Sequence, residues 1–306
     1  MVSRVVLVTK RSPLEELVLK HLTFNKAEFA LKAAGQSIAT YVEEDSRYQA
    51  AVTAIRAQVP NDLPVSVMRR DELANANFQF RDTDLIVVCG PDGLFVNVAR
   101  YVRDQLVLTV NPGVFGAGAL MLFPPSKVGG VIASIQNGTH HVERLPLLKA
   151  VIDDERVMWA ASDIFVGRTD KVSAWYELLF GRVQEVQGSD GVLVSSGIGS
   201  TGWIQSVVNM VEGLTREGTP HKLKQLPAAA SNELVFVVQN PISSPTTGHS
   251  IITGRITPSK PLSLYSRMPE GGFIFSDGML EQAEAWNAGS WVAVTVGDRY
   301  VQRIVP

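Results

Sequence analysis

An apolar run, Asp84–Cys89, stops abruptly at the turn sequence Gly90-Pro91-Asp92-Gly93, and a second apolar segment follows at Leu94–Tyr101. This order predicts a buried strand, a tight turn and a helix. In an open parallel sheet, ligands bind beyond the carboxyl ends of the strands, where a following helix offers unpaired backbone N–H groups. Asp92 is therefore predicted at a ligand-binding edge, where a carboxylate suits holding a metal or accepting a proton. Taken alone, the segment is also ordinary turn chemistry.

A second segment, residues 189–203, is typical of a short strand followed by a loop of glycine, serine and threonine. A helix is expected to follow from Ile204 to about Gly213. Apolar residues recur there at helical spacing, which predicts a face packed in the core: Trp203, Val207, Met210 and Leu214. The small residues leave backbone N–H and hydroxyl groups uncovered at the helix N-terminus, which suits a phosphate or a ribose.

In order along the chain, these two segments resemble the signatures of the NAD kinase family. Those signatures are Gly-Gly-Asp-Gly after a strand and, further on, Asp-Gly-x-x-x-Ser-Thr-Pro-Thr-Gly-Ser-Thr-Ala-Tyr. Residues 110–124 resemble the family's strand and its Asn-containing loop, most like the divergent branch that includes the mitochondrial enzyme. Residues 161–167 fall where the family has Asn-Glu before an apolar strand, and residues 240–250 and 275–278 loosely resemble later segments. The resemblance spans most of the chain.

Several positions depart from the family pattern. Pro91 replaces the second glycine of Gly-Gly-Asp-Gly, which removes one backbone N–H where the family's loop approaches phosphates. Leu94 stands where a threonine is usual, and Trp203 where the second signature has tyrosine. Ser162-Asp163 shortens both side chains of the Asn-Glu pair, so their hydrogen bonds to a nucleotide need a closer ligand or a water.

Composition limits the class of protein. The 306 residues are 45% hydrophobic and 19% charged, which fits two globular domains. A formal net charge of −2 gives no electrostatic footprint for nucleic acid or an anionic membrane. The single cysteine, Cys89, cannot form an internal disulfide, and the chain opens directly with a strand pattern. A cytoplasmic location is therefore expected.

The pattern of elements predicts an α/β N-terminal domain, residues 1–140, with a Rossmann-like parallel sheet that carries the Gly-Pro-Asp-Gly turn. It includes strands at Arg4–Thr9 and Val65–Arg69 and a long helical region from about Asn25 to Gln58. Residues 141–306 are predicted to form a β-rich dinucleotide-binding domain, with a last strand that could pack back on the first domain. Arg216–Ser231 is polar and contains two prolines, which favours a surface loop.

The resemblance implies an ATP-dependent kinase that phosphorylates the 2′-hydroxyl of the adenosine ribose of NAD to give NADP. Asp92 would be the general base, and Mg²⁺ would be held mainly by the triphosphate, with no protein ligand set of its own. The resemblance also implies a homodimer or homotetramer whose ligands are small-molecule nucleotides. The residues implied to bind nucleotide are Gly90, Gly93, Asn111, Ser162, Asp163, Asp190, Gly199, Ser200, Thr201, Gly202, Trp203 and Ser206.

Two other functions stay open at this point. One is a kinase of the same fold that acts on another hydroxyl, such as that of a lipid or a sugar-like acceptor. The other is a nucleotide-binding protein without catalysis, in which Pro91 and Leu94 have ended productive triphosphate binding. The donor, whether ATP, another triphosphate or polyphosphate, and the choice between NAD and NADH also stay open.

Overall fold

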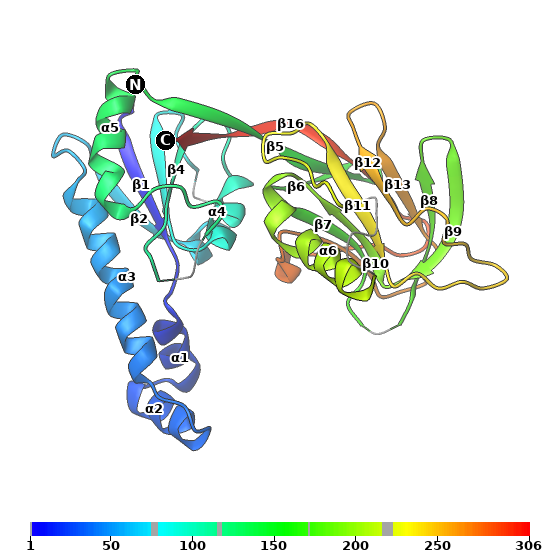
Figure 1. Ribbon diagram of the computed structural model, residues 1–306, viewed down its shortest axis with the longest axis horizontal. Coiled ribbons are helices and arrows are strands. Elements are labelled where there is room, and N and C mark those ends of the chain that lie inside the picture. Colours follow the sequence, from blue (N-terminus) through cyan, green and yellow to red (C-terminus); the bar gives the residue numbers. More distant parts are fainter. Residues whose placement is uncertain (1, 75–78, 115–117, 171, 216–222) are drawn as a thin grey trace. The chain divides into compact units, whose positions relative to one another are not determined.

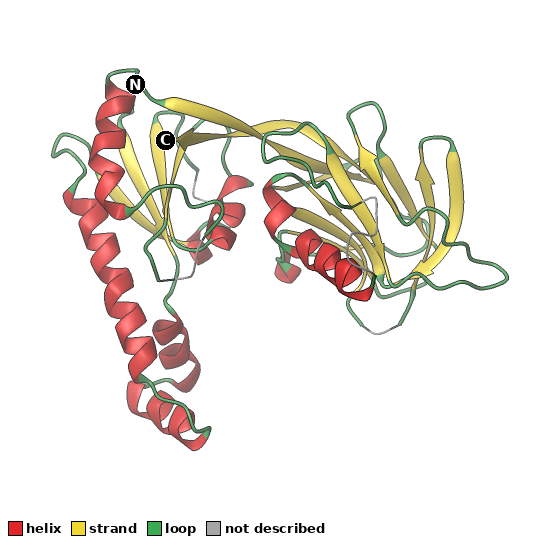
Figure 2. Ribbon diagram, in the orientation of Figure 1, coloured by secondary structure: helices red, strands yellow, loops and turns green. Residues whose placement is uncertain are grey.

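The computed structural model describes the chain except for residues 1, 75–78, 115–117, 171 and 216–222. It divides into two compact units (Figure 1). Unit 1 comprises Met1–Glu143 and Val301–Pro306, and unit 2 comprises Arg144–Tyr300. Helices accompany the sheet of unit 1, whereas unit 2 is built mostly of strands (Figure 2), so the predicted fold class is confirmed.

The sheet of unit 1 is parallel. Its strands are, in spatial order, β2 (Val65–Arg69), β1 (Arg4–Thr9), β3 (Asp84–Cys89), β4 (Leu106–Val110) and the end of β16 (Trp291–Val305). Every residue of β3 is buried, because helices cover both faces of a parallel sheet. This explains why β3 reads as one continuous apolar run instead of an alternating pattern.

Two layers of helices flank this sheet. α3 and α5 pack on one face through Tyr48, Ile55, Val128 and Ile132. α4 lies on the opposite face, where Phe95 contacts the guanidinium of Arg303. The helices of unit 1 are α1 (Pro13–His21), α2 (Phe24–Ala33), α3 (Ala39–Ala57), α4 (Asp92–Ala99) and α5 (Val128–Gln136), with short 3₁₀ turns η1 (Arg70–Glu72) and η2 (Pro125–Lys127).

The prediction of one long helical region from Asn25 to Gln58 was wrong, because two helices occupy it. α2 ends at Ala33, and Gly35 adopts a left-handed φ of 72° just beyond it. Glycine reaches that conformation without the steric cost that a side chain imposes, so the chain turns there before α3 begins. α1 was also missed, although Ser12 and Glu15 form a capping box at its start.

Unit 2 packs two antiparallel sheets around one apolar core. The first sheet runs β12 (Thr253–Ile256), β11 (Leu234–Gln239), β10 (Gly191–Ser195), β7 (Asp163–Arg168), β14 (Gly272–Ser276), β15 (Glu284–Ala285). The second contains β5 (His141–Ile152), β6 (Arg156–Ala160), β8 (Ala174–Phe180), β9 (Val183–Ser189), β13 (Leu262–Ser266) and β16. Short 3₁₀ turns η3 (Ile198–Thr201) and η4 (Leu280–Gln282) complete it.

Helix α6 (Trp203–Leu214) covers the outer face of the first sheet. Its buried residues are Ile204, Val207 and Val208, whereas Trp203 is 38%, Met210 52% and Leu214 80% exposed. The prediction that Trp203, Val207, Met210 and Leu214 form the core face was therefore wrong for three of the four. The helix rests on the sheet along one side only, so the buried stripe is displaced around its axis from the predicted one.

One further boundary differs from expectation. The apolar pattern over Val157–Val166 predicts a single strand, but the chain bends at Ala161-Ser162 and forms β6 and β7. β16 continues to Val305, and its last residues pair with β4. Of the expected surface loop Arg216–Ser231, residues 216–222 lie outside the described part of the chain.

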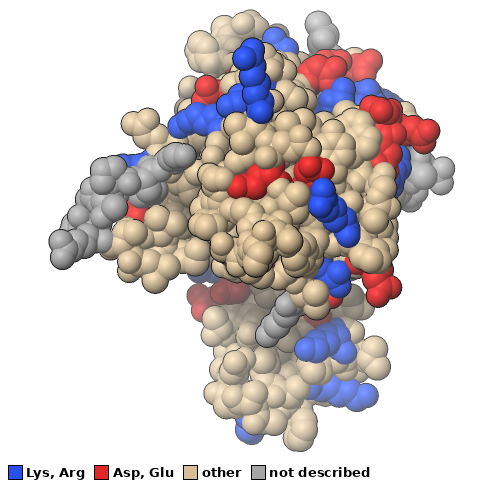
Figure 3. Space-filling model, turned by 90° about the vertical axis from the view of Figure 1, so that its right-hand side faces the viewer, with Lys and Arg blue, Asp and Glu red and all other residues tan. Residues whose placement is uncertain are grey.

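The described surface is of mixed charge, and acidic and basic side chains are interspersed over the face drawn in Figure 3. Among the described residues, no helix is long and apolar enough to span a bilayer.

Candidate functional site

The turn after β3 has the predicted form. β3 ends at Cys89 and α4 begins at Asp92, with Pro91 as its extended N-cap residue. The N–H of Gly90 donates to the Val110 carbonyl across 3.3 Å, which ties the turn to the end of β4. A Cβ on Gly90 would lie 2.7 Å from the Leu94 side chain, so a larger residue there would require Leu94 to move. Gly93 lies on the first turn of α4 with open space around it.

The Asp92 carboxylate is held by the chain's own backbone. Its Oδ2 accepts the N–H of Ala119 across 2.9 Å, and its Oδ1 accepts the N–H of Leu120 across 3.0 Å. A Cβ on Gly118 would lie 2.7 Å from Oδ1, so this glycine lets the loop approach. The two bonds fix the orientation of the carboxylate, and each oxygen keeps a lone pair for a further partner.

Asn111 shapes the same loop from its other end. Its Oδ1 accepts the N–H of Gly113 across 2.8 Å, and its own N–H donates to the Phe123 carbonyl across 2.8 Å. Gly113 has a left-handed φ of 74°, which this turn requires. Asn111 and Asp92 thus follow the carboxyl ends of neighbouring parallel strands, as the sequence predicted.

In unit 2 the register of the first sheet brings Asp163 opposite Ser195. The Ser162 hydroxyl donates to Asp163 Oδ2 across 2.5 Å. Asp163 Oδ1 is buried and has no hydrogen-bond partner among the described groups. Burial raises the pKa of the Asp163 carboxyl above its ordinary value, and the hydrogen bond from Ser162 offsets part of that rise.

Asp277 holds the corner that carries these two side chains. Its carboxylate accepts the backbone N–H groups of Ala161, Ser162 and Asp163 across 2.9, 2.8 and 3.2 Å. Asp277 was not among the predicted site residues. The signal in the sequence is the pair Asp277-Gly278, because both residues adopt left-handed φ values, 53° and 72°, that favour such residue types.

The loop before α6 lies directly against this corner. A Cβ on Gly199 would fall 2.4 Å from Ser195 Oγ and 2.8 Å from Ser162 Oγ, so no larger residue fits. The Ser196 hydroxyl donates to the Ala161 carbonyl across 2.6 Å and accepts the N–H groups of Ile198 and Gly199. Residues from two predicted motifs, Ser162-Asp163 and Gly199, are therefore brought together.

Trp203 begins α6 beside this loop. Its indole stacks on Phe165, with ring centroids 5.3 Å apart and planes inclined by 17°, and also lies 6.4 Å from Phe275. Trp203 is 38% exposed, so it covers two buried phenylalanines and still presents a surface to solvent. Four further predicted residues lie on this loop or the first turns of α6: Ser200, Thr201, Gly202 and Ser206.

Asp190, which also belongs to unit 2, does not lie near Ser162, Asp163 and Gly199. It precedes β10, whereas Ser195 ends it, and five strand residues at roughly 3.3 Å each separate the two ends by about 17 Å. Asp190 Oδ2 instead accepts a hydrogen bond from the Asn240 side-chain amide across 2.6 Å. The predicted set is thus divided between the two ends of one strand.

The described residues contain no group of three or more His, Cys, Asp or Glu side chains arranged to hold a metal ion. Asp92 is the carboxylate at the turn after β3. A single carboxylate fits Mg²⁺ only where phosphate oxygens and water supply the other ligands, which is how Mg²⁺ is usually bound with nucleotides.

Comparison with known proteins relates this geometry to a family. No protein-family model matches the chain. Proteins named NAD kinase from the Saccharolobus islandicus strains M.14.25 and M.16.27 are each 27% identical to it over 194 residues. These matches cover 63% of this chain and 66% of each relative, so slightly less than two thirds of the relatives' length is matched. A crystal structure of yeast NADH kinase complexed with NADH has the same fold, with a TM-score of 0.65 at 13% identity, covering 100% of this chain and 84% of the other.

Proposed function

Because the chain belongs to the NAD kinase family, we propose that it transfers a phosphoryl group from ATP to the 2′-hydroxyl of the adenosine ribose of NAD or NADH. The observation that carries this proposal is Asp92, a carboxylate on the first residue of a helix at the carboxyl end of a parallel strand. Phosphoryl transfer needs little covalent chemistry from the protein and depends on positioning and on charge stabilisation. The fixed carboxylate supplies positioning of the acceptor hydroxyl, and the N–H groups at the helix N-terminus supply charge stabilisation.

In this proposal Asp92 accepts the proton of the acceptor hydroxyl. The N–H groups of Ala119 and Leu120 hold its carboxylate in one orientation, so the remaining lone pairs have a fixed direction. Gly93 leaves open space beside the carboxylate, which gives a phosphate access to the backbone of the first turn of α4. Mg²⁺, bound mainly by the phosphate oxygens, would neutralise the charge that develops on them.

Unit 2 would bind the dinucleotide. The exposed face of Trp203 offers a purine a stacking surface already fixed by Phe165 and Phe275. Asp163 Oδ1 lacks a partner, and a hydroxyl or amino group of the ligand would supply one. Ser162 and the loop hydroxyls of Ser200 and Thr201 offer further hydrogen bonds.

The oligomeric state, a homodimer or a homotetramer, stays a prediction. Light scattering on the full chain would test it by measuring the mass of the assembly.

The test measures NADP formation from NAD with ATP and Mg²⁺ by wild type and Asp92→Asn, together with NAD binding by calorimetry. Loss of a general base should lower kcat by roughly 10²–10⁴-fold. The affinity for NAD should change far less, because the proposed dinucleotide contacts lie in unit 2. Equal turnover by the two proteins would reject Asp92 as the base.

Asp92→Asn also weakens the loop, since a side-chain amide nitrogen cannot accept the N–H of Ala119 or Leu120. Gly118→Ala is a matched control for this effect. Its added Cβ would press on Asp92 Oδ1 at 2.7 Å and disturb the same loop, but the carboxylate remains. If Asp92 acts as the base, Asp92→Asn should lose much more activity than Gly118→Ala. Equal losses would assign Asp92 a structural role only.

A second candidate function is nucleotide binding without transfer. It is favoured by Pro91, which offers no N–H at the N-cap of α4, and by the use of both Asp92 oxygens within the chain. NAD binding without NADP formation from ATP, other triphosphates or polyphosphate would support this candidate. Absence of NAD binding would direct the search to an acceptor hydroxyl on a different molecule.

A further inference from the structure

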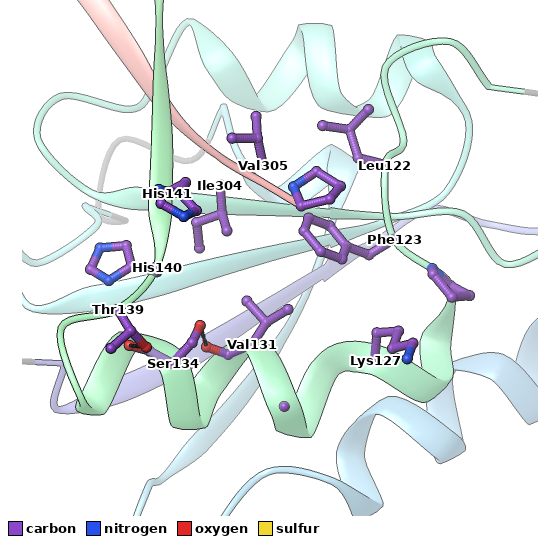
Figure 4. A pocket seen from close by; sticks show the side chains of 13 residues that line it. Leu122, Phe123, Lys127, Val131, Ser134, Thr139, His140, His141, Ile304 and Val305 are labelled. Carbon is purple, nitrogen blue, oxygen red and sulfur yellow. Dashed lines mark hydrogen bonds between the residues drawn. The ribbon is translucent and has the colours of Figure 1, made fainter.

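Unit 1 contains a cavity of about 470 Å³ that is lined by none of the proposed catalytic or nucleotide-binding residues. It lies beside α5, and the segment after β4, the start of β5 and the end of β16 complete its walls (Figure 4). Its volume lies in the range of roughly 300–1,000 Å³ that is typical of small-molecule sites. The cavity is therefore large enough to take a ligand of its own.

The cavity is lined mainly by apolar side chains. Phe123 and Ile304 are buried core residues that also line it, and Val131 of α5 faces them (Figure 4). Lys127, Gly130, Val131 and Ser134 recur at helical spacing, so one face of α5 forms a wall. A Cβ on Gly130 would meet nothing within 4 Å, so this glycine leaves space that a side chain would fill.

The ionisable side chains that line the cavity are Lys127, His140 and His141, and none of the lining side chains is acidic. His140 Nδ1 is buried and has no hydrogen-bond partner among the described groups. A buried polar atom without a partner costs free energy, and a ligand atom that bonds to it removes that cost. The lining side chains are therefore complementary to an anion.

We propose that this cavity binds an aliphatic monocarboxylate. The aliphatic chain of the ligand packs against Phe123, Val131 and Ile304. The ligand's carboxylate accepts a hydrogen bond from His140 Nδ1, with His141 beside it. The wall from Lys127 to Ser134 is roughly 10 Å long at the helical rise of about 1.5 Å per residue. A medium-length chain such as that of decanoate suits this wall, because it covers the apolar surface and leaves the head group near the imidazoles.

The experiment titrates the full chain with decanoate, below its micellar concentration, in a calorimeter, with 1-decanol as the uncharged comparison. Decanoate should bind saturably with one molecule per chain and more tightly than 1-decanol. His140→Leu should lower the affinity for decanoate by about tenfold, which is the effect of losing one hydrogen bond to a charged group. The affinity for 1-decanol should change little. Binding that does not saturate, or equal affinity for decanoate in His140→Leu, would overturn the proposal.

A second pair of variants tests the location. Gly130→Leu fills the open space at the α5 wall and should abolish decanoate binding. Gly213→Leu is the matched control, because Gly213 is also a helical glycine with open space around it, but lies in α6. Both changes favour the helix, since leucine has the higher helix propensity. Undiminished decanoate binding by Gly130→Leu would refute the site, and NAD binding by the same variant shows that unit 2 is intact.

Discussion

The carboxylate of Asp277 accepts the backbone N–H of Ser162 across 2.8 Å, although 115 positions separate the two residues in the sequence. The same carboxylate also accepts the N–H groups of Ala161 and Asp163. These bonds replace the strand pairing that the chain lacks where β6 ends and β7 begins. The position of Ser162 and Asp163 therefore depends on a residue at the end of β14.

Asp277→Ala should destabilise unit 2 and weaken NAD binding. The change leaves three backbone N–H groups without their acceptor, at a cost of about 1–3 kcal/mol for each that stays buried. It also strains the backbone, because φ at this position is 53°. Urea unfolding and NAD calorimetry measure the two effects.

Asp277→Asn is the conservative comparison. Its side-chain oxygen can still accept the N–H groups of Ser162 and Asp163, and asparagine tolerates the left-handed conformation. We expect a smaller loss of stability and of NAD affinity than in Asp277→Ala. Equal losses in the two variants would show that the hydrogen bonds to Ser162 and Asp163 contribute little.

Gly199→Ala should displace the loop before α6. The added Cβ would lie 2.4 Å from Ser195 Oγ and 2.7 Å from the Ser162 carbonyl oxygen, so the loop or the corner must move. We expect a loss of about 1–3 kcal/mol in the free energy of unfolding and a weaker affinity for NAD. Gly213→Ala, with open space around it, should bind NAD as wild type does. Normal NAD affinity in Gly199→Ala would remove this loop from the proposed site.

Trp203 should report dinucleotide binding by its fluorescence. Its indole is exposed on one side and fixed by Phe165 on the other, so a stacked purine should quench it. In Trp203→Phe the quenching should largely disappear, while NAD affinity falls only by about 1 kcal/mol or less, because a smaller aromatic face remains. Unchanged quenching would mean that another of the five tryptophans reports binding.

Local sequence patterns predicted three strands of unit 1 well. β1, β2 and β3 have the predicted bounds, because each is rich in β-branched or other apolar residues and is bounded by turn-forming or polar residues. The same reasoning failed for α6, since apolar residues at helical spacing do not reveal which side meets a sheet. The buried stripe is set by contacts with β7, β10 and β11, which only the folded chain supplies.

Part of the candidate site was predictable from its residue types. Small residues around Gly199 were predicted to suit a phosphate or a ribose, which stays a prediction, and the structure shows that Ser162 and Ser195 lie against this glycine. Asp277 was missed because its partners are more than a hundred positions away, where local periodicity carries no information. Asp190 and Ser195 are far apart because β10 is an extended strand that separates them. This distance can be inferred only once residues 191–195 are known to form a strand.

The buried carboxyl of Asp163 should make the stability of the protein depend on pH. Burial raises its pKa in the folded chain, whereas in the unfolded chain the carboxyl titrates near its ordinary value of 3.8. Above that value the unfolded chain releases the proton more readily than the folded chain does. The contribution of Asp163 to the free energy of unfolding should therefore be most favourable below pH 3.8. This contribution should fall as the pH rises towards the pKa of Asp163 in the folded chain.

Asp163→Asn isolates this contribution, because asparagine does not titrate and its oxygen can still accept the Ser162 hydroxyl. Urea unfolding of both proteins from pH 4 upward should show wild type losing stability relative to the variant. The difference should grow by at most about 1.4 kcal/mol per pH unit, the limit for one proton, and then level off above the folded pKa. Parallel stability curves would mean that Asp163 ionises normally in the folded chain. In that case the unpartnered Oδ1 is satisfied by solvent, and a dinucleotide gains no advantage by bonding to it.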